Sequence, residues 1–365
     1  MGTNNKWLWV LVFTALLGIA SCKLGRFVVY NFADVKDYKR FPSRPLLAHQ
    51  TPFKFFETTT GKYPKSVKNK SFDAFLEDKN TLAFLIIKND TIQYEKYFDN
   101  YQQNSWVPSF SVAKSVISIL VGCAIDDGFI KSVDEPITNY IPELKDKGFD
   151  KVSIKQVLQM TSGLDFNESY VNPFGHAASF YYGLNLRKEI SKLKLKNTPG
   201  TTFDYVSGNS QLLGLIVERS LKGKTVTAYL QEKIWTPLGM EYNASWSLDQ
   251  EENGLEKTFC CLNACARDFA KIGRLYKNKG NWNGKQIISE KWVMESTKLD
   301  TTEGSAPYYQ YQWWLPKPGE DFVAVGILGQ YIYVNPKKDV VIVRLGKNKG
   351  SVEWRSFFRE LASAY

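Results

Sequence analysis

The sequence predicts an α+β fold of the α/β sandwich type, in which a mostly antiparallel sheet built from both chain ends is flanked by helices and joined to a helical subdomain. Three observations predict it. Strand-like runs lie near the start of the body, at 81–98, and near its end, at 308–346. Helical patterns fill most of the chain between them, and a last helical pattern covers 351–365. One sheet that collects both groups of strands is the economical arrangement.

The composition is that of an ordinary globular protein, since 44% of the 365 residues are hydrophobic and 23% are charged. This length is enough for a large domain with a sizeable core. The formal net charge is +10, but the basic clusters are short and acidic residues lie among or near them. Because a nucleic-acid binder concentrates its basic residues in a patch, this distribution indicates a solvated basic surface and no nucleic-acid partner.

Residues 1–22 differ from the rest of the chain. One lysine precedes a short apolar run that ends in small residues and Cys22, a pattern typical of a secretory signal peptide. The sequence IASC at 19–22 resembles the bacterial lipoprotein box, which implies cleavage before Cys22 and lipidation of that residue. Two alternatives remain open: a transmembrane anchor extended through 24–32, and a plain signal with a chance cysteine. All three export the body to the cell envelope or leave it facing outward.

The rest of the chain divides into an extension and a body. Residues 23–69 are irregular and contain several prolines, so we expect a tether that drapes over the body. We expect the body, residues 70–365, to contain a sheet subdomain, about 70–110 and 300–365, and a helical subdomain, about 111–299.

The elements follow in order along the body. Two β-rich runs around Asn89 and Asp90 predict a hairpin. The stretch 111–130 is apolar on nearly every side, so it predicts a buried helix. Further helical patterns with Gly or Pro punctuation fill the middle, and strand runs return at 308–316, 322–336 and 339–346, the last two joined by a turn.

The cysteines of the body do not form a metal-binding pattern. Cys123 lies in the apolar helix, and Cys260, Cys261 and Cys265 form a cluster without a CxxC pair or a nearby histidine. We therefore expect no metal and no cofactor. Buried free thiols are favoured for these residues, and a disulfide within the cluster stays open because an exported protein could form one.

A lysine inside an apolar helix raises the question of function. Ser111 and Lys114 are three residues apart in FSVAKSV, so a helix places both on one face. Burial and the positive end of a helix lower a lysine pKa, and a neutral lysine can take a proton from a serine hydroxyl. The alternative is a lysine that reaches solvent from the helix end. A second Ser-x-x-Lys, Ser191 to Lys194, lies in a charged stretch and indicates a solvated helix face.

Two further segments carry candidate groups. Tyr205 lies in a loop just before an apolar helix, where it could pass a proton between a serine, a lysine and a leaving group. Gly326 and Gly329 interrupt a strand, which often marks the close approach of a ligand or another backbone. The backbone N–H of Gln330 could then form an oxyanion hole with the N–H of Ser111. The alternatives are that Tyr205 only packs against its neighbours and that the two glycines only form a β-bulge.

Taken together, these segments resemble the serine β-lactamase and penicillin-binding-protein superfamily. The resemblance runs from about residue 70 to the end and is nearest to the class C-like branch, which includes esterases and 6-aminohexanoate-dimer hydrolase. It implies a β-lactamase-like fold, with Ser111 as nucleophile, Lys114 as general base and Tyr205 as the tyrosine of the second motif. The segments that reinforce it are 157–164, 212–218, 229–240 and 263–276.

Two departures limit what the resemblance implies. The second motif usually has an asparagine two residues after the tyrosine, and here that position is Ser207. The third motif is commonly Lys-Thr-Gly, and here it is Ile327-Leu328-Gly329, so the cation that would receive a substrate carboxylate is missing. This argues against efficient β-lactam hydrolysis and D,D-peptidase activity.

For the other candidate pocket residues, a structural role is the simpler interpretation. His176 lies in a long aromatic-rich loop that could line the site, although a surface position is the simpler interpretation. Trp313 and Trp314 could form a pocket wall, although packing in the core is the simpler interpretation. The sequence has two histidines, His49 and His176, which makes a Ser-His-Asp hydrolase a poor interpretation.

The sequence therefore predicts a membrane-tethered serine hydrolase that cleaves a small ester or amide through an acyl-enzyme on Ser111. Two alternatives stay open. One is a D,D-peptidase or β-lactamase proper, and the other is a non-catalytic envelope binding protein on the same scaffold.

Overall fold

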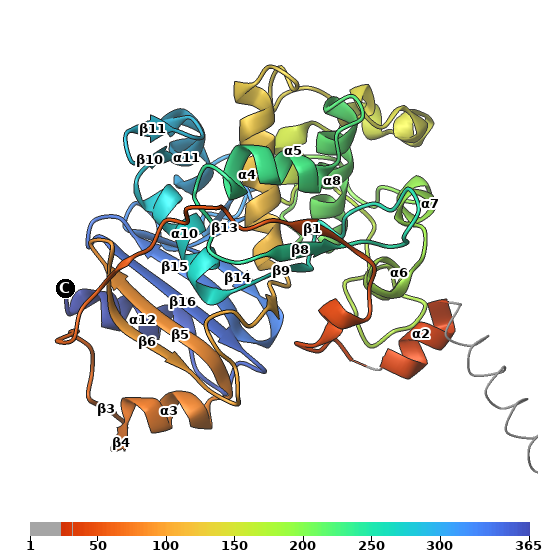
Figure 1. Cartoon of the computed structure of the whole chain (residues 1–365). Coiled ribbons are helices and arrows are strands. Elements are labelled where there is room, and N and C mark those ends of the chain that lie inside the picture. The colour runs from red at the N-terminus through yellow and green to blue at the C-terminus, as the bar shows by residue number, and fades with distance from the viewer. Residues whose placement is uncertain (1–22, 31) are drawn as a thin grey trace, which may run out of the picture.

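The computed structural model describes residues 23–30 and 32–365. Its main sheet has eight strands in the order β12-β13-β14-β15-β16-β5-β6-β2 (Figure 1), antiparallel except for β2 with β6. Strands from both ends of the chain share this sheet, which confirms the predicted fold class. The strands are β2 Phe56–Glu57, β5 Thr81–Lys88, β6 Thr91–Tyr97, β12 Tyr309–Gln310, β13 Trp313–Lys317, β14 Asp321–Gly326, β15 Gln330–Asn335 and β16 Val340–Gly346.

The centre of the sheet joins the two ends of the body. Strand β16 pairs with β5 from Val340 opposite Lys88 to Gly346 opposite Thr81. The predicted hairpin β5–β6 is present, and both residues of its turn, Asn89 and Asp90, adopt positive φ angles of 48° and 56°. Asn and Asp tolerate this left-handed conformation better than other non-glycine residues, which explains the turn at this position.

Alternate side chains of the sheet face two different helical layers. Helices α3 (Phe72–Asp78) and α12 (Trp354–Ser363) cover one face, where they pack against residues such as Phe84 and Tyr333. Helix α10 (Ala266–Lys277) packs against β15, β16 and β5 on the opposite face. The sequence predicts this segment in the helical subdomain, whereas the structure places it against the sheet. A Cβ at Gly273 would lie 2.7 Å from Val341 Cγ1, so this glycine lets α10 lie close against the sheet.

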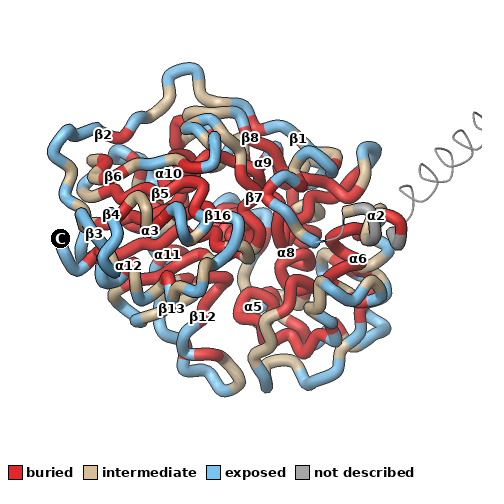
Figure 2. The backbone as a smooth tube through the Cα atoms, turned by 90° about the horizontal axis from the view of Figure 1, so that it is seen from below, coloured by how far each residue is buried: buried red, intermediate tan, exposed pale blue. Residues whose placement is uncertain are grey.

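The helical layer surrounds α4, which spans Val112–Asp126 and runs through the middle of the molecule (Figure 1). All residues of α4 from Val112 to Ala124 are buried, as its apolar sequence predicts. Helix α4 packs against α8, β14 and β15, and α8 is itself largely buried (Figure 2). The other helices of this layer are α5 Ile154–Leu158, α6 His176–Tyr182, α7 Leu186–Ser191, α8 Ser207–Ser220, α9 Val226–Leu230 and α11 Glu290–Thr297.

A second, smaller sheet was not predicted. It has four strands in the order β1-β8-β9-β7. Its strands are two to four residues long, too short for a periodic pattern to stand out in the sequence. They are β1 Ser43–Leu46, β7 Val107–Pro108, β8 Ala244–Ser247 and β9 Leu262–Ala264; the remaining strands pair as β3 Ser66–Val67 with β4 Lys70–Ser71, and β10 Asn281–Trp282 with β11 Lys285–Gln286.

The described part of the extension is packed on the body. Strand β1 pairs with β8 and β2 joins the main sheet. Phe41, Leu46 and Phe55 are buried, and the buried carboxylate of Asp37 accepts a 2.5 Å hydrogen bond from the Tyr181 hydroxyl. Apolar side chains spread among the prolines therefore dock this segment on the body.

The predicted signal peptide, 1–22, with the lipidation site Cys22, lies outside the described residues. Among those that the structure describes, no helix combines the length and the apolar character needed to cross a membrane. Helix α2, Lys23–Tyr30, is the first described element and contacts α6.

The run 322–336, predicted as one strand, is a hairpin. Strands β14 and β15 are joined by a turn at 327–329, where Leu328 and Gly329 have positive φ angles of 62° and 86°. The glycines therefore mark a reversal of the chain and not a bulge within a strand. The predicted turn between β15 and β16 is present at 336–339.

Candidate active site

Ser111 lies where the chain turns from β7 into α4. Phe110, the residue before it, is buried and has a φ of +44°, a left-handed conformation that is rare for an aromatic residue. The backbone N–H of Ser109 donates to the carbonyl of Leu262 at 2.8 Å. Strained backbone of this kind persists where its surroundings fix it, and it often accompanies functional groups. The turn presents the partly exposed Ser111 at the N-terminus of α4.

Lys114 is almost completely buried, with 1% of its surface exposed. Its Nζ lies 3.2 Å from Ser111 Oγ, 2.9 Å from Ser207 Oγ and 2.9 Å from the Phe259 carbonyl oxygen. Each of these partners is neutral, so direct contact with a carboxylate does not stabilise the ammonium form. Desolvation lowers the pKa of Lys114 to about 8, against the opposing effect of the Glu168 carboxylate.

Tyr205 lies just before α8, with its ring centroid 5.5 Å from Lys114 Nζ. Burial raises the pKa of Tyr205 above that of a free phenol, although a hydrogen bond with Ser111 opposes this shift. The ring packs against Trp314, at 5.3 Å between centroids. The structure thus brings the predicted serine, lysine and tyrosine together. The opposite pKa shifts make Lys114 the group that loses a proton more easily.

Ser207 connects Lys114 to two residues that the sequence analysis missed. Its backbone N–H and its hydroxyl both contact the Glu168 carboxylate, at 2.7 Å and 2.5 Å. The Tyr170 hydroxyl lies 3.2 Å from Ser207 Oγ. Glu168 and Tyr170 come from an irregular loop, where no periodic pattern shows which side chains turn inward. The available signal was the aromatic-rich character of the segment that begins at Tyr170, which identifies a loop but no role.

His176 supports this loop. Its Nδ1 accepts the backbone N–H of Asn167 at 3.0 Å, and its ring stacks on Phe166 at 5.2 Å between centroids. His176 therefore holds Asn167, the residue before Glu168. Among the described residues, His176 forms no hydrogen bond with Ser111 or Lys114.

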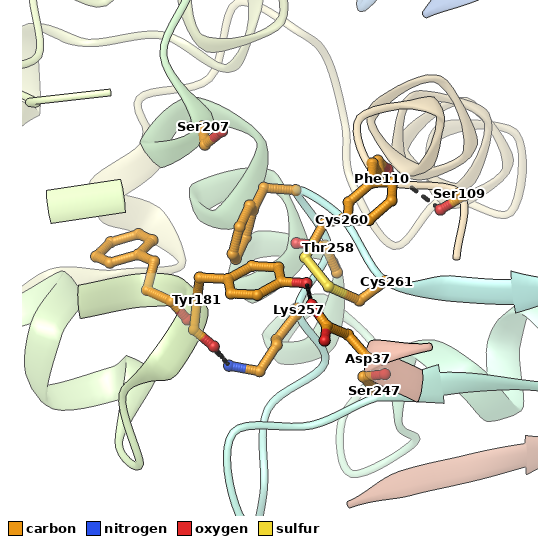
Figure 3. The surroundings of a disulfide bond; sticks show 12 residues. Asp37, Ser109, Phe110, Tyr181, Ser207, Ser247, Lys257, Thr258, Cys260 and Cys261 are labelled. Atoms are coloured by element: carbon orange, nitrogen blue, oxygen red, sulfur yellow. Dashed lines mark hydrogen bonds between the residues drawn. A yellow bond between two sulfur atoms is a disulfide. The ribbon is translucent and has the colours of Figure 1, made fainter. Parts of the chain in front are cut away.

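A disulfide lies beside the site. Cys260 and Cys261 are joined although they are neighbours in sequence, which corrects the expectation of free thiols at these positions. Side chains of successive residues point to opposite sides in extended backbone, but Cys261 has a φ of +70°, and this turn brings the two sulfurs together. Figure 3 shows the disulfide next to Phe110. Cys123 and Cys265 are free and buried, as expected.

The turn at 327–329 approaches the nucleophile from the sheet. A Cβ at Gly326 would lie 2.5 Å from the Ser109 carbonyl oxygen, so the predicted close approach is made by Gly326. Gln330, the predicted oxyanion donor, is fully buried opposite Gly326, and its side chain bonds both backbone groups of Gly346.

The remaining third-motif residues and Trp313 have different surroundings. Ile327 and Leu328 are partly buried, and the Gly329 carbonyl accepts from the buried Arg344 at 2.8 Å, on the interior side of the turn. Trp313, expected as a possible pocket wall, lies in the core against Tyr276, and its neighbour Trp314 is the residue that contacts Tyr205.

Comparison with known proteins agrees with this fold. The Beta-lactamase family model matches residues 69–357. The chain is 30% identical over 291 residues to a 6-aminohexanoate-dimer hydrolase of Paenarthrobacter ureafaciens, an alignment that covers 74% of this chain and 73% of the relative.

Solved structures share the fold at lower identity. A candidate 6-aminohexanoate-dimer hydrolase from Bacillus anthracis aligns with a TM-score of 0.79 at 24% identity, over 90% of this chain and 92% of its own. A family VIII carboxylesterase aligns with a TM-score of 0.63 at 17% identity, over 80% and 95% of the two chains. A class C β-lactamase in complex with cefoxitin aligns with a TM-score of 0.60 at 16% identity, over 80% and 96%. The chain belongs to the Beta-lactamase family and is a serine hydrolase.

Proposed function

We propose that this chain hydrolyses a small ester or amide that lacks a carboxylate next to the scissile bond, through an acyl-enzyme on Ser111. The observation that carries the proposal is the buried amine of Lys114, 3.2 Å from Ser111 Oγ, with a pKa lowered to about 8. Near neutral pH a useful fraction of such an amine is uncharged, so it can accept the serine proton.

The proposed reaction has two halves. In the first, Ser111 Oγ forms a bond to the substrate carbonyl carbon while its proton passes to Lys114. Tyr205, which contacts Ser111, helps to pass that proton to the leaving group. In the second half, water attacks the acyl carbon, the bond between that carbon and Ser111 Oγ breaks, and the same groups pass a proton of the water to Ser111 Oγ. The N–H of Ser111 and a backbone N–H of the 326–330 hairpin, Gln330 in our prediction, stabilise the oxyanion.

The third-motif sequence supports the choice of substrate class. Ile327 and Leu328 occupy the positions where a cation would bind a carboxylate, and Arg344 bonds the turn from its buried side. An uncharged group therefore fits this side of the site better than the carboxylate of a β-lactam. The relative that shares 30% identity is named a 6-aminohexanoate-dimer hydrolase, which supports including that compound among the substrates tested.

The test is a panel of short-chain p-nitrophenyl esters, 6-aminohexanoate dimer and nitrocefin, with the full chain in detergent and a Ser111→Ala variant as control. We expect turnover of esters or of the amide, loss of that turnover in S111A, and labelling of Ser111 by a fluorophosphonate probe. Faster turnover of nitrocefin than of every other compound would favour a β-lactamase proper. No turnover and no labelling would favour a binding protein.

We also propose that the protein is exported and tethered to a membrane through a lipid on Cys22. The lipoprotein-like sequence before Cys22 supports this proposal. Metabolic labelling with a radioactive fatty acid tests it, because label should be incorporated into the wild-type chain and not into a Cys22→Ser variant. A labelled C22S chain, or an unlabelled wild type, would contradict lipidation at this position.

A further inference from the structure

If Lys114 is the base, its amine must have a specific orientation. A neutral amine has two N–H groups and one lone pair, and the lone pair must face Ser111 for proton transfer. Lys114 has three neighbours at hydrogen-bond distance: Ser111 Oγ, Ser207 Oγ and the Phe259 carbonyl. The orientation is correct only if the other two neighbours accept the two N–H groups.

One of these acceptors needs no further control. The Phe259 carbonyl oxygen can only accept, so it always takes one N–H of Lys114. A serine hydroxyl is different, because it can donate or accept. If Ser207 donated its proton to Lys114, it would occupy the lone pair that Ser111 needs.

Glu168 removes this ambiguity. Its carboxylate lies 2.5 Å from Ser207 Oγ and also accepts the backbone N–H of Ser207 at 2.7 Å. An ionised carboxylate has no proton to give, so the proton at the 2.5 Å contact belongs to Ser207 and points away from Lys114. Ser207 Oγ then presents its lone pairs to Lys114. The nearby Tyr170 hydroxyl can donate to Ser207 or to Glu168 without disturbing this arrangement.

We propose that Glu168 is a positioning residue that directs the lone pair of Lys114 to Ser111 by holding the hydroxyl proton of Ser207. This inference rests on the proposed function. In the acylation step the Ser111 proton moves to that lone pair as the Ser111 oxygen bonds to the carbonyl carbon. Lys114 then carries three N–H groups, of which the new one faces Ser111 and the leaving group. The second motif has Ser207 in place of the usual asparagine. This serine needs a partner carboxylate, which makes the hydroxyl oxygen accept from Lys114.

The pH profile separates this role from simple support of the loop. The groups around Lys114 are Ser111 just before α4, Tyr205 just before α8, Ser207 at the start of α8, Phe259, and the Glu168–Tyr170 pair. Among the described residues, Glu168 is the carboxylate whose charge raises the pKa of Lys114. Its removal should move the acid limb of kcat/KM to lower pH. A loosened loop that admits water would raise the pKa of Lys114 and move the limb to higher pH.

The experiment compares wild type with Glu168→Gln, using a p-nitrophenyl ester and the full chain in detergent. The backbone N–H and the hydroxyl of Ser207 donate to different oxygens of Glu168, and glutamine replaces one of those oxygens with an NH2 group that cannot accept. We expect kcat to fall at least about tenfold with KM within about twofold, and the acid limb to move to lower pH. Asp165→Asn is the matched control, because Asp165 is an exposed acid on the same loop and its loss should change neither quantity.

A double variant tests the route through Ser207. If Glu168 acts through that hydroxyl, E168Q should lower kcat by less than about twofold in a Ser207→Ala background. The inference would be overturned by wild-type kcat in E168Q or by an acid limb of kcat/KM at higher pH. It would also be overturned if the losses in kcat of E168Q and S207A multiply in the double variant.

Further variants cover the remaining outcomes. If E168Q does not fold, S207A should lose kcat while Ser207→Asn, whose amide oxygen can only accept, should retain most of it. Equal kcat in S207A and wild type would overturn the inference. An inactive wild type with an unlabelled Ser111 would instead refute the proposed function, and the positioning role with it.

Discussion

The carbonyl oxygen of Phe259 lies 2.9 Å from Lys114 Nζ, and the residue that follows Phe259 in the chain belongs to a disulfide. On the other side of that disulfide, the carbonyl of Leu262 accepts the N–H of Ser109, two residues before the nucleophile. One short segment therefore contacts both the proposed base and the turn that presents Ser111.

Reduction of the disulfide should lower activity. Opening the Cys260–Cys261 bond frees the backbone next to Phe259, and a displacement of about 1 Å at a reacting group can cost about a hundredfold in rate. We expect a loss of kcat of at least about tenfold after treatment with dithiothreitol. Thiol titration of the unfolded chain should find two more thiols after reduction than before.

The controls for this prediction use the other cysteines. A Cys265→Ala variant, which removes a free buried thiol, should keep the sensitivity to reductant. A Cys260→Ala/Cys261→Ala variant should lose it. Equal thiol counts before and after reduction would show that this disulfide is not formed.

Substitution of the proposed nucleophile or base should abolish turnover. We expect Ser111→Ala and Lys114→Ala each to lower kcat/KM by at least about a thousandfold, because both bond formation and proton transfer are affected. Circular dichroism should show that the fold is kept. The second Ser-x-x-Lys of the chain offers a control: Ser191 ends α7 at the surface, so Ser191→Ala/Lys194→Ala should have wild-type kinetics. Unchanged turnover in S111A or K114A would remove that residue from its role.

Activity should rise with pH through the pKa of Lys114. Burial lowers this pKa from 10.5 to about 8, and the base must be neutral to accept a proton. Below that value each pH unit should lower kcat/KM about tenfold, because the ammonium form predominates. Steady-state rates measured with an ester from about pH 6 to about pH 10 check this, after correction for spontaneous hydrolysis. A profile that is flat across this range would contradict a lysine base.

The close approach of Gly326 should be essential for activity. A Cβ at this position would lie 2.5 Å from the Ser109 carbonyl oxygen, so Gly326→Ala must displace the hairpin or the turn before Ser111. We expect a loss of kcat/KM of about a hundredfold. Gly128→Ala is the control, because its Cβ would meet no atom within 4 Å. That variant should cost about 1 kcal/mol of stability, from its φ of +76°, and no activity. Thermal unfolding and ester kinetics on both variants make the comparison.

The sequence predicted the parts of this molecule that have strong local patterns. The apolar surroundings of Lys114 predicted a buried helix, and Asn89-Asp90 predicted a hairpin, because burial and turn chemistry act over a few residues. Strand runs at both ends predicted the shared sheet. The serine, lysine and tyrosine could be placed together only through the resemblance to a family, since about ninety positions separate Lys114 from Tyr205 in sequence.

Other features depend on contacts that local patterns do not contain. Glu168 reaches Ser207 from an irregular loop, and the backbone conformation of that loop decides which side chain points inward. The bond between Cys260 and Cys261 requires the positive φ of Cys261. Trp313 and Trp314 are adjacent, and only the strand register shows which one lies in the core and which one contacts Tyr205.

The central pairing of β16 with β5 has a consequence for how the molecule is made. Strand β5 leaves the ribosome long before its neighbour β16, because the helical layer lies between them in the sequence. Until then the β5–β6 hairpin has an open edge in what becomes the middle of the sheet. A nonsense codon anywhere before β16 would therefore leave that edge exposed, and the shortened product would be a target for proteolysis and aggregation.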